Sequence, residues 1–251
     1  MRSNHIPESV GRPAIVGQTA WDAALAAITK HEEAVSADLQ ELVAARKRMP
    51  MVRVEGDYVF DGPDGQRTLR ELFDGRSQLI LYRFFFEDGV DGWPDAGCAG
   101  CSSWADGIAE LGLLHARDIT FAMASPAPQT NLHRYAQRMG WTDVPWYSIR
   151  TEAFTADFGV DEWFGLNMFL RDGDEVYRTY FLQHGPMVQS IGSVWSLFSL
   201  TPYGGQIDDE DAPKGWPRAP MSFWYRRRDE FDEPPPSVSG RAEGVAENDQ
   251  P

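Results

Sequence analysis

The sequence contains little cysteine and little positive charge. Only two of its 251 residues are cysteine, and 38 acidic residues outnumber 23 lysines and arginines, which gives a formal charge of −15. Two cysteines are too few for a disulfide scaffold. An acidic chain repels the phosphates of nucleic acids and anionic membrane surfaces, so we expect neither nucleic acid nor membrane as a partner.

Long apolar segments are also missing. No stretch reaches the roughly 18–20 apolar residues that a membrane span needs, and Met1–Glu8 lacks the apolar centre of a secretory signal. We therefore expect a cytoplasmic protein. The composition, with 42% apolar and 12% aromatic residues, is typical of a folded domain.

Changes in composition divide the chain into four parts. Residues 1–18, which contain proline and glycine, predict an extended arm, and residues 19–49 predict a long helix. Residues 50–231 form the expected domain, which ends in a tryptophan-containing strap packed on its surface. Residues 232–251 are acidic and proline-containing and predict a disordered tail.

The long helix carries an apolar stripe at alternating spacings of four and three residues, in which Glu32 is the one polar position; its apolar members are Trp21, Leu25, Ile28, Val35, Leu39 and Leu42. The interpretation that we favour is that this stripe packs along the rest of the domain. The alternative is an antiparallel or dimeric coiled coil, which would join copies of the chain into a homo-oligomer.

From residue 51 onward, short strands alternate with helical segments. Residues 78–86 and 119–124 are near-continuous apolar runs, typical of central strands that are buried on both faces. Helical periodicity follows each run, over 102–114 after the first and over 129–139 after the second. Residues 166–182 predict a hairpin before a last helix over 188–200. The pattern predicts an α/β fold with a central mixed sheet and helices on both faces.

Both cysteines lie in one motif, Cys98-Ala99-Gly100-Cys101, which follows the first apolar run and a polar loop and begins a helical pattern. A strand, a loop and Cys-x-x-Cys at a helix start form the active-site layout of thioredoxin-like oxidoreductases. Backbone N–H groups at the helix start lower the pKa of the first thiol. We therefore expect Cys98 as the exposed nucleophile and Cys101 as the more buried resolving thiol.

The surroundings of the motif modify this prediction. Acidic residues in the preceding loop are expected to raise the pKa of a nearby thiol, with Arg83 as the one cation close in sequence. Asp106 lies about one turn past Cys101. It is a candidate proton acceptor that would act through a water, and the alternative is that it lies at the surface without a role in the chemistry. The residues expected to support the dithiol are Arg83, Trp93, Ser102, Trp104 and Asp106.

Three alternatives to a redox role remain. In the first, the two cysteines supply half of the ligands of a zinc site, but the sequence lacks a second pair of ligands, so we expect no metal. In the second, both cysteines are unreactive residues of the buried core. A redox-inactive domain that serves as a binding module is the third alternative.

Several pieces of the chain, taken together, resemble a known family. They are Tyr58–Gly65, Leu72–Leu79, Gly97–Asp106, Arg138–Trp141 and Asp157–Val160. From Met49 to Phe231 the chain resembles the bacterial thioredoxin-like family catalogued as domain of unknown function 899 (DUF899), often labelled predicted dithiol–disulfide oxidoreductases.

The resemblance implies a thioredoxin-like fold with Cys98 and Cys101 as the redox centre. The chain departs from the family at Ala99, where proline is usual, and at Arg83, where histidine is usual. We expect a thiol–disulfide oxidoreductase whose only redox group is its own disulfide, without a bound cofactor. Its partners would be a thiol or disulfide substrate, either a protein or a small molecule, and an external thiol reductant.

Overall fold

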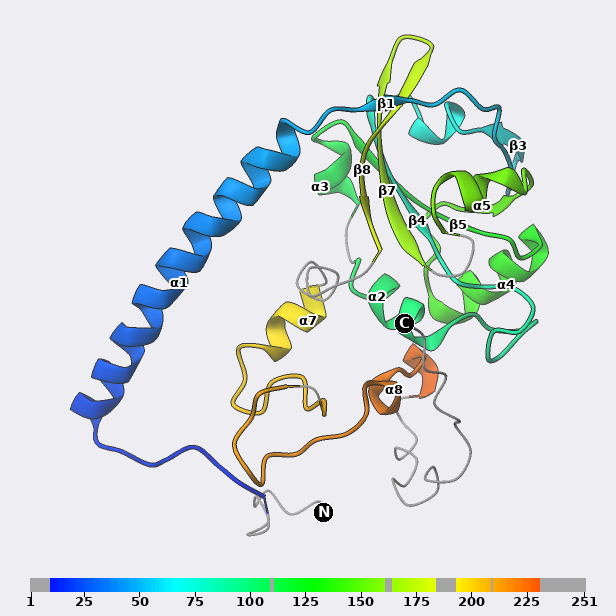
Figure 1. Ribbon diagram of the computed structural model, residues 1–251. Helices are drawn as coiled ribbons and strands as arrows, with labels where there is room; N and C mark the ends of the chain where they lie inside the picture. Colours follow the sequence, from blue (N-terminus) through cyan, green and yellow to red (C-terminus); the bar gives the residue numbers. More distant parts are fainter. Residues whose placement is uncertain (1–9, 109–110, 161–163, 184–192, 209, 231–251) are drawn as a thin grey trace, which may run out of the picture.

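The computed structural model describes residues 10–108, 111–160, 164–183, 193–208 and 210–230 (Figure 1). The predicted tail over 232–251 and the first half of the predicted arm lie outside these residues. Residues 11–17 have no regular secondary structure, as expected for an extended arm. Within the described part of the chain, no helix has the length and apolarity needed to cross a bilayer.

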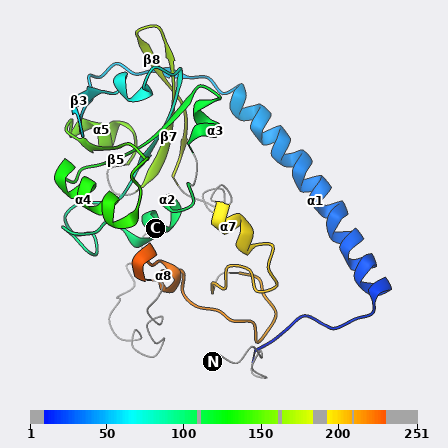
Figure 2. The same ribbon diagram turned by 180° about the vertical axis from the view of Figure 1, so that it is seen from behind.

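The long helix α1 spans Gln18–Lys47 and none of its residues is buried. In both views it stands apart from the sheet (Figure 1, Figure 2). The apolar stripe is therefore exposed and does not pack along the domain, in contrast to the arrangement that we favoured from the sequence. Near its end, Arg46 lies over the ring of Tyr180, 5.0 Å from the ring centroid.

The described strands form one mixed sheet in the order β1-β8-β7-β4-β5-β6-β2-β3. The central strand β4 pairs in parallel with β5 and antiparallel with β7, whereas β7 and β8 form an antiparallel hairpin. The strand bounds are β1 Val52–Arg53, β2 Val59–Gly62, β3 Gly65–Thr68, β4 Gln78–Arg83, β5 Ile119–Ser125, β6 Trp146–Ile149, β7 Gly165–Asp172 and β8 Glu175–Leu182. The predicted mixed sheet is confirmed.

Helices cover both faces of the sheet. One face packs against α2 (Ala99–Ala105), α3 (Gly112–His115) and α4 (Gln129–Met139) through an aromatic-rich cluster that contains Tyr82, Phe84 and Cys101. The other face packs against the 3-10 helix η1 (Glu71–Phe73) and α5 (Ala153–Asp157). Side chains of β4 alternate between the two clusters, as the period of a strand requires. The remaining helices, on the C-terminal side of the sheet, are α7 Ser193–Phe198, α8 Met221–Trp224 and the 3-10 helix η2 Arg228–Glu230.

Two short elements differ from the sequence expectations. The helix expected over 102–114 begins earlier, at Ala99, and stops at Ala105, before the separate helix α3 begins. Asp106 follows this break, and its carboxylate accepts a hydrogen bond from the indole of Trp141 at 2.8 Å. The helix α5 was not predicted, because five residues are too few to show helical periodicity.

The packing of the central strand gives a test of the fold. Leu81 on β4 is 1% exposed, so Leu81→Ala removes a fully buried side chain and leaves a cavity. We expect the free energy of unfolding to fall by about 2–5 kcal/mol, measured by urea denaturation. Leu113→Ala on α3, where the side chain is 63% exposed, is the matched control and should change it by less than about 0.5 kcal/mol. Equal effects of the two substitutions would contradict the described packing.

Candidate functional site

The central strand positions Cys98 directly. After β4 the chain forms a loop and returns, so that the backbone N–H of Cys98 donates to the carbonyl of Phe85 at 3.0 Å. Cys98 is the N-cap of α2, and its Sγ accepts the backbone N–H of Cys101 at 3.5 Å. Its thiol is half-buried, whereas Cys101 is 2% exposed on the first turn of the helix. The first thiol is thus the accessible one, as predicted.

A glycine is required just before the first cysteine. Gly97 is buried, and a Cβ added to it would lie 2.6 Å from the ring of Phe84 and 3.1 Å from the side chain of Phe86. Both rings belong to the cluster beneath α2. The absence of a side chain therefore lets the loop lie on the aromatic core and brings Cys98 close to the end of β4.

The two thiols are in opposite electrostatic environments. The pKa of Cys98 is lowered to about 6, mainly by a hydrogen bond from the thiol of Cys101, with help from the backbone N–H groups of Cys101 and Gly100 and the charge of Arg227. Burial opposes this effect. Burial is also the main reason that the pKa of Cys101 is raised well above its ordinary value. At pH 7 the pair therefore holds one thiolate, on Cys98, and one thiol.

Tyr82 lies beneath the pair, on the face of β4 that packs against α2. Its side chain is 1% exposed, and its hydroxyl donates a hydrogen bond to the sulfur of Cys101. Burial and the nearby cysteine sulfurs raise the pKa of Tyr82 well above its ordinary value, so it stays protonated and remains a donor. This donor favours a negative charge on Cys101.

The cation that acts on Cys98 comes from the C-terminal strap. Arg227 is 8% exposed, and its guanidinium donates to the carbonyl of Gly97 at 3.0 Å and to that of Asp91 at 2.8 Å. It also pairs with Glu230 at 2.9 Å. Arg227 thus binds both ends of the loop before Cys98 and places a positive charge near the thiolate. Arg227 was not predicted from the sequence, where the basic triplet 226–228 was its only signal.

The acidic loop does not have the predicted effect, because arginines lie beside three of its carboxylates. Glu87 pairs with Arg83 at 2.6 Å and Asp95 with Arg134 at 2.7 Å. The carboxylate of Asp91 lies 3.8 Å from the guanidinium of Arg227. The expectation that this loop raises the pKa of Cys98 is therefore corrected: the pKa of Cys98 is lowered.

Two of the five predicted supporting residues contact the dithiol segment or Tyr82 directly. The buried hydroxyl of Ser102 donates to the carbonyl of Cys98 at 2.8 Å and also hydrogen-bonds with the hydroxyl of Tyr135. The ring of Trp104 lies on that of Tyr82, with centroids 4.5 Å apart.

The other three predicted residues act at a greater distance. Trp93 packs edge-on against Phe86. The carboxylate of Asp106 accepts a hydrogen bond from the indole of Trp141, so its observed partner is an aromatic residue of the core and not a thiol. Burial raises the pKa of Asp106. Arg83 is 1% exposed, pairs with Glu87 and lies over the ring of Phe85.

The strap also covers the start of α2. A Cβ added to Gly100 would lie 3.3 Å from the ring of Tyr225, which places that ring directly on the dithiol turn. Burial, and after it the nearby sulfurs of Cys98 and Cys101, raise the pKa of Tyr225. The hydroxyl of Ser103 donates to the carbonyl of Arg226 at 3.2 Å and fixes the strap to the helix.

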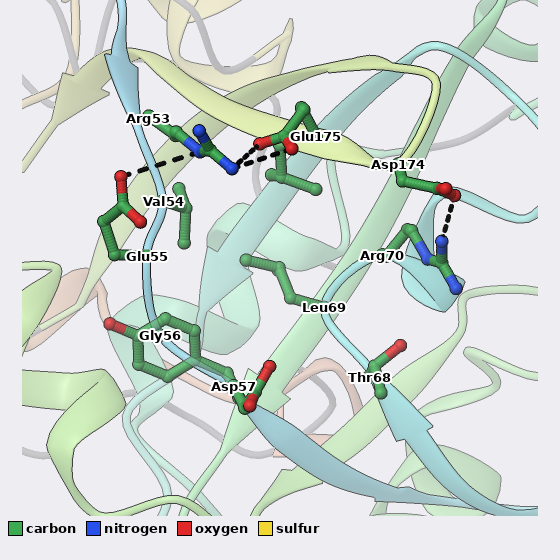
Figure 3. Close-up of a pocket in the computed structure, with 12 residues that line it drawn as sticks. Arg53, Val54, Glu55, Gly56, Asp57, Thr68, Leu69, Arg70, Asp174 and Glu175 are labelled. Atoms are coloured by element: carbon green, nitrogen blue, oxygen red, sulfur yellow. Dashed lines mark hydrogen bonds and ion pairs between the residues drawn. The ribbon is translucent and has the colours of Figure 1, made fainter.

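A separate surface pocket lies at the opposite end of the sheet, between β1, the end of β3 and the β7–β8 turn (Figure 3). Its arginines are paired: Arg53 with Glu175 at 2.6 Å, and Arg70 with Asp174. Neither cysteine lines it. Because both of its arginines are paired with carboxylates and no thiol lines it, this pocket does not compete with the dithiol as a thiol-reactive site.

The zinc alternative gains no support from the geometry. Within the described residues, no group of three or more His, Cys, Asp or Glu side chains is arranged to hold a metal ion.

The connections around the dithiol define the class of the protein. The strand before Cys-x-x-Cys, β4, lies between its parallel neighbour β5 and the antiparallel hairpin β7–β8. The helix that begins at the motif, α2, packs on one face of this sheet. This is the arrangement of a thioredoxin-like protein. The profile of the family described as "Bacterial protein of unknown function (DUF899)" matches residues 10–231, and the chain belongs to this family.

Solved structures with related folds share little sequence with the chain. The pneumococcal exposed lipoprotein thioredoxin Etrx1 of Streptococcus pneumoniae is 11% identical with a TM-score of 0.40, over 58% of this chain and 100% of that one. Reduced Prx3 of Vibrio vulnificus, in complex with H2O2, is 13% identical with a TM-score of 0.34, over 54% and 84%. BsSco, a member of the Sco family of cytochrome c oxidase assembly proteins, is 12% identical with a TM-score of 0.35, over 55% and 87%. No curated protein matches the chain significantly.

The position of Arg227 gives a test of the site. Arg227→Met removes the positive charge and the bonds to the Gly97 and Asp91 carbonyls. The pKa of Cys98, about 6 in the unaltered chain, should rise by about half a unit or more. The measurement is the pH dependence of iodoacetamide alkylation of Cys98, located by mass spectrometry.

The matched control for this test is Arg228→Gln. It removes the same charge from the next residue, whose guanidinium donates to the carbonyl of Met139. The alkylation midpoint of the control should stay near that of the unaltered chain. Equal shifts in the two variants would mean that Arg227 acts only through net charge.

Proposed function

We propose that this protein catalyses thiol–disulfide exchange, with Cys98 as the nucleophile and Cys101 as the resolving thiol. The observation that carries the proposal is the difference between the two cysteines. Cys98 is half-buried and its pKa is lowered to about 6, whereas Cys101 is buried and its pKa is raised. The thiolate is the reactive form in exchange, and the resolving thiol must be protected until a mixed disulfide has formed.

The reaction has two steps. The Cys98 thiolate attacks one sulfur of a substrate disulfide, and the other substrate sulfur leaves as a thiolate and takes a proton. Cys101 then gives up its proton and attacks Sγ of Cys98, which forms the Cys98–Cys101 disulfide and releases the second substrate thiol. The substrate gains two electrons and two protons: both electrons come from the dithiol, one proton comes from Cys101 and the other from the solvent.

The described residues support each step. In the first, the N–H groups of Gly100 and Cys101 and the charge of Arg227 stabilise the attacking thiolate. In the second, the charge on Cys98 is gone once the mixed disulfide forms, so one of the causes that raise the pKa of Cys101 disappears. The hydroxyl of Tyr82 then stabilises the emerging Cys101 thiolate.

No bound cofactor takes part in the proposed reaction, because the electrons are held by the dithiol itself. An external thiol reductant restores the pair by the reverse exchange. The proposed compartment is the cytoplasm, where glutathione and related thiols supply such electrons. The substrate class is a disulfide of a protein or a small molecule.

A trapping experiment tests the assignment of roles. In Cys101→Ser the resolving thiol is lost, so reaction with a small disulfide such as hydroxyethyl disulfide should leave a stable mixed disulfide on Cys98, detected by intact mass. Cys98→Ser retains only the buried thiol with its raised pKa and should react at least about tenfold more slowly at pH 7.

The unaltered chain should instead form a Cys98–Cys101 disulfide that dithiothreitol reverses, seen as the loss and return of two alkylatable thiols. Absence of this reversible disulfide would overturn the proposed function. A mixed disulfide on Cys101 in preference to Cys98 would reverse the roles of the two residues.

The contact with Tyr82 predicts a change in the second step alone. Tyr82→Phe removes the donor to Cys101 and should slow resolution of the mixed disulfide by about tenfold or more, followed by rapid acid quench and mass spectrometry. The pH midpoint for alkylation of Cys98 should remain near 6. Tyr180→Phe on β8 removes a hydroxyl from another strand and should change neither rate. Unchanged resolution in Tyr82→Phe would show that this hydroxyl has no part in the step.

A further inference from the structure

The helix α1 exposes an unusually complete apolar stripe. Its large apolar side chains are between 38% and 57% exposed: Trp21, Leu25, Ile28, Val35, Leu39, Leu42 and Val43. No residue of the helix is buried. Isolated apolar residues are common on protein surfaces, but a stripe that runs from Trp21 to Val43 with Glu32 as its one polar position marks an interaction surface.

The same chain holds both ends of this helix in place. Before it, Gly11 donates to the carbonyl of Gly215 at 2.7 Å and accepts a hydrogen bond from Tyr203 at 3.1 Å. After it, β1 pairs with β8. A helix fixed in this way is already ordered, so a partner helix meets a prepared surface and less conformational entropy is lost on association.

The stripe has the spacing of a coiled-coil seam. Trp21, Ile28, Val35 and Leu42 repeat every seven residues and occupy one core position of the heptad, d. The other core position, a, is occupied by Leu25, Glu32, Leu39 and Arg46. We propose that α1 pairs with α1 of a second copy of this chain as an antiparallel coiled coil.

The antiparallel direction follows from where the two charged core residues fall. In a parallel pair, each a residue faces its own copy, so Glu32 would face Glu32 and Arg46 would face Arg46 in the seam, and like charges repel. In an antiparallel pair, a residues pack against d residues. Neither charge then faces its own copy across the seam.

One antiparallel register matches the two helices almost over their full length. It pairs Leu25 with Leu42 and Ile28 with Leu39 of the second copy, and the reciprocal pairs repeat across the two-fold axis. Trp21 then falls in the layer of Arg46, whose guanidinium lies over the Tyr180 ring of its own chain, so the layers from Leu25 to Leu42 carry the pairing. Glu32 lies opposite Val35, so the two Glu32 side chains occupy neighbouring layers on either side of the axis, each facing an apolar residue. The stripe is thus complementary to itself, which is the requirement for a symmetric dimer interface.

The flanking charges agree with the same register. In an antiparallel pair the residues that precede the a positions face one another, and here His31 falls beside Asp38 of the second copy on both sides of the axis. The opposite flank brings Thr29 beside Ser36, without charge. This register therefore places no like charges opposite one another along its flanks.

The first test is the oligomeric state of the full chain, measured by sedimentation velocity over a range of concentrations. We expect a dimer that dissociates on dilution. Ile28→Glu with Leu39→Glu places two glutamates in one core layer of each interface half and should raise the Kd about a hundredfold or more. Both side chains are exposed in the single chain, 57% and 47%, so the variant should fold, as circular dichroism would show.

Ala37→Glu, on the opposite face of the same helix, is the control and should leave the Kd within about threefold of the unaltered chain. A full chain that stays monomeric at all concentrations would overturn the proposal. A dimer that is equally stable in Ile28→Glu/Leu39→Glu would place the interface elsewhere and overturn it too.

Cross-linking tests the direction. In a Cys98→Ser/Cys101→Ser background, the antiparallel register predicts that a chain carrying both Leu25→Cys and Leu42→Cys forms a disulfide-linked dimer under mild oxidation. Neither single substitution should do so. A dimer linked by Leu42→Cys alone would indicate parallel helices, and the antiparallel proposal would be wrong.

Discussion

The buried guanidinium of Arg227 joins the two parts of the site that lie farthest apart in the chain. A buried charge is costly unless it is paired and hydrogen-bonded, and this one has the Gly97 and Asp91 carbonyls and the Glu230 carboxylate as partners. The hydrogen bonds of this guanidinium to the Gly97 and Asp91 carbonyls fix the strap against the loop before Cys98. The environment of the dithiol therefore depends on a segment at the C-terminal side of the domain. Removal of that segment would change both the shape of the loop and the charge near Cys98, although all of the sheet would remain.

Much of the domain could be predicted from the sequence because its signals are local. The central strands β4 and β5 are apolar runs, α4 has a clear helical period, and the predicted bounds of α4, 129–139, coincide with the structure. The Cys-x-x-Cys spacing identified the only cysteine pair, and its place at a helix start followed from the neighbouring pattern. The relative burial of the two cysteines was also predictable, because it depends on the geometry of one helical turn.

The rest depends on contacts between distant segments, which a single sequence does not show. Arg83 was chosen as the nearby cation because it is close to Cys98 in sequence, but it lies in a strand whose neighbouring residues, Tyr82 and Phe84, are the ones facing α2. Arg227 acts instead, because the strap folds back over the helix. The effect of the acidic loop was wrongly predicted for the same reason: its Glu87, Asp91 and Asp95 carboxylates lie beside arginines from β4, the strap and α4. The period of α1 was clear, but whether its stripe meets its own domain is a tertiary question.

The unequal surroundings of the two cysteines have a consequence for the direction of exchange. Every contact that lowers the pKa of Cys98 stabilises the reduced pair, since the disulfide carries no charge for Arg227 or the helix N–H groups to stabilise. In an exchange reaction this favours reduction of the Cys98–Cys101 disulfide, and so makes it a stronger oxidant. The buried Cys101 opposes this effect only weakly, because it is an uncharged thiol at neutral pH and its burial costs little. Arg227 thus links the packing of the strap to the equilibrium between the dithiol and the disulfide. A change in the packing of the strap changes this equilibrium, and formation of the disulfide changes the interactions that hold the strap.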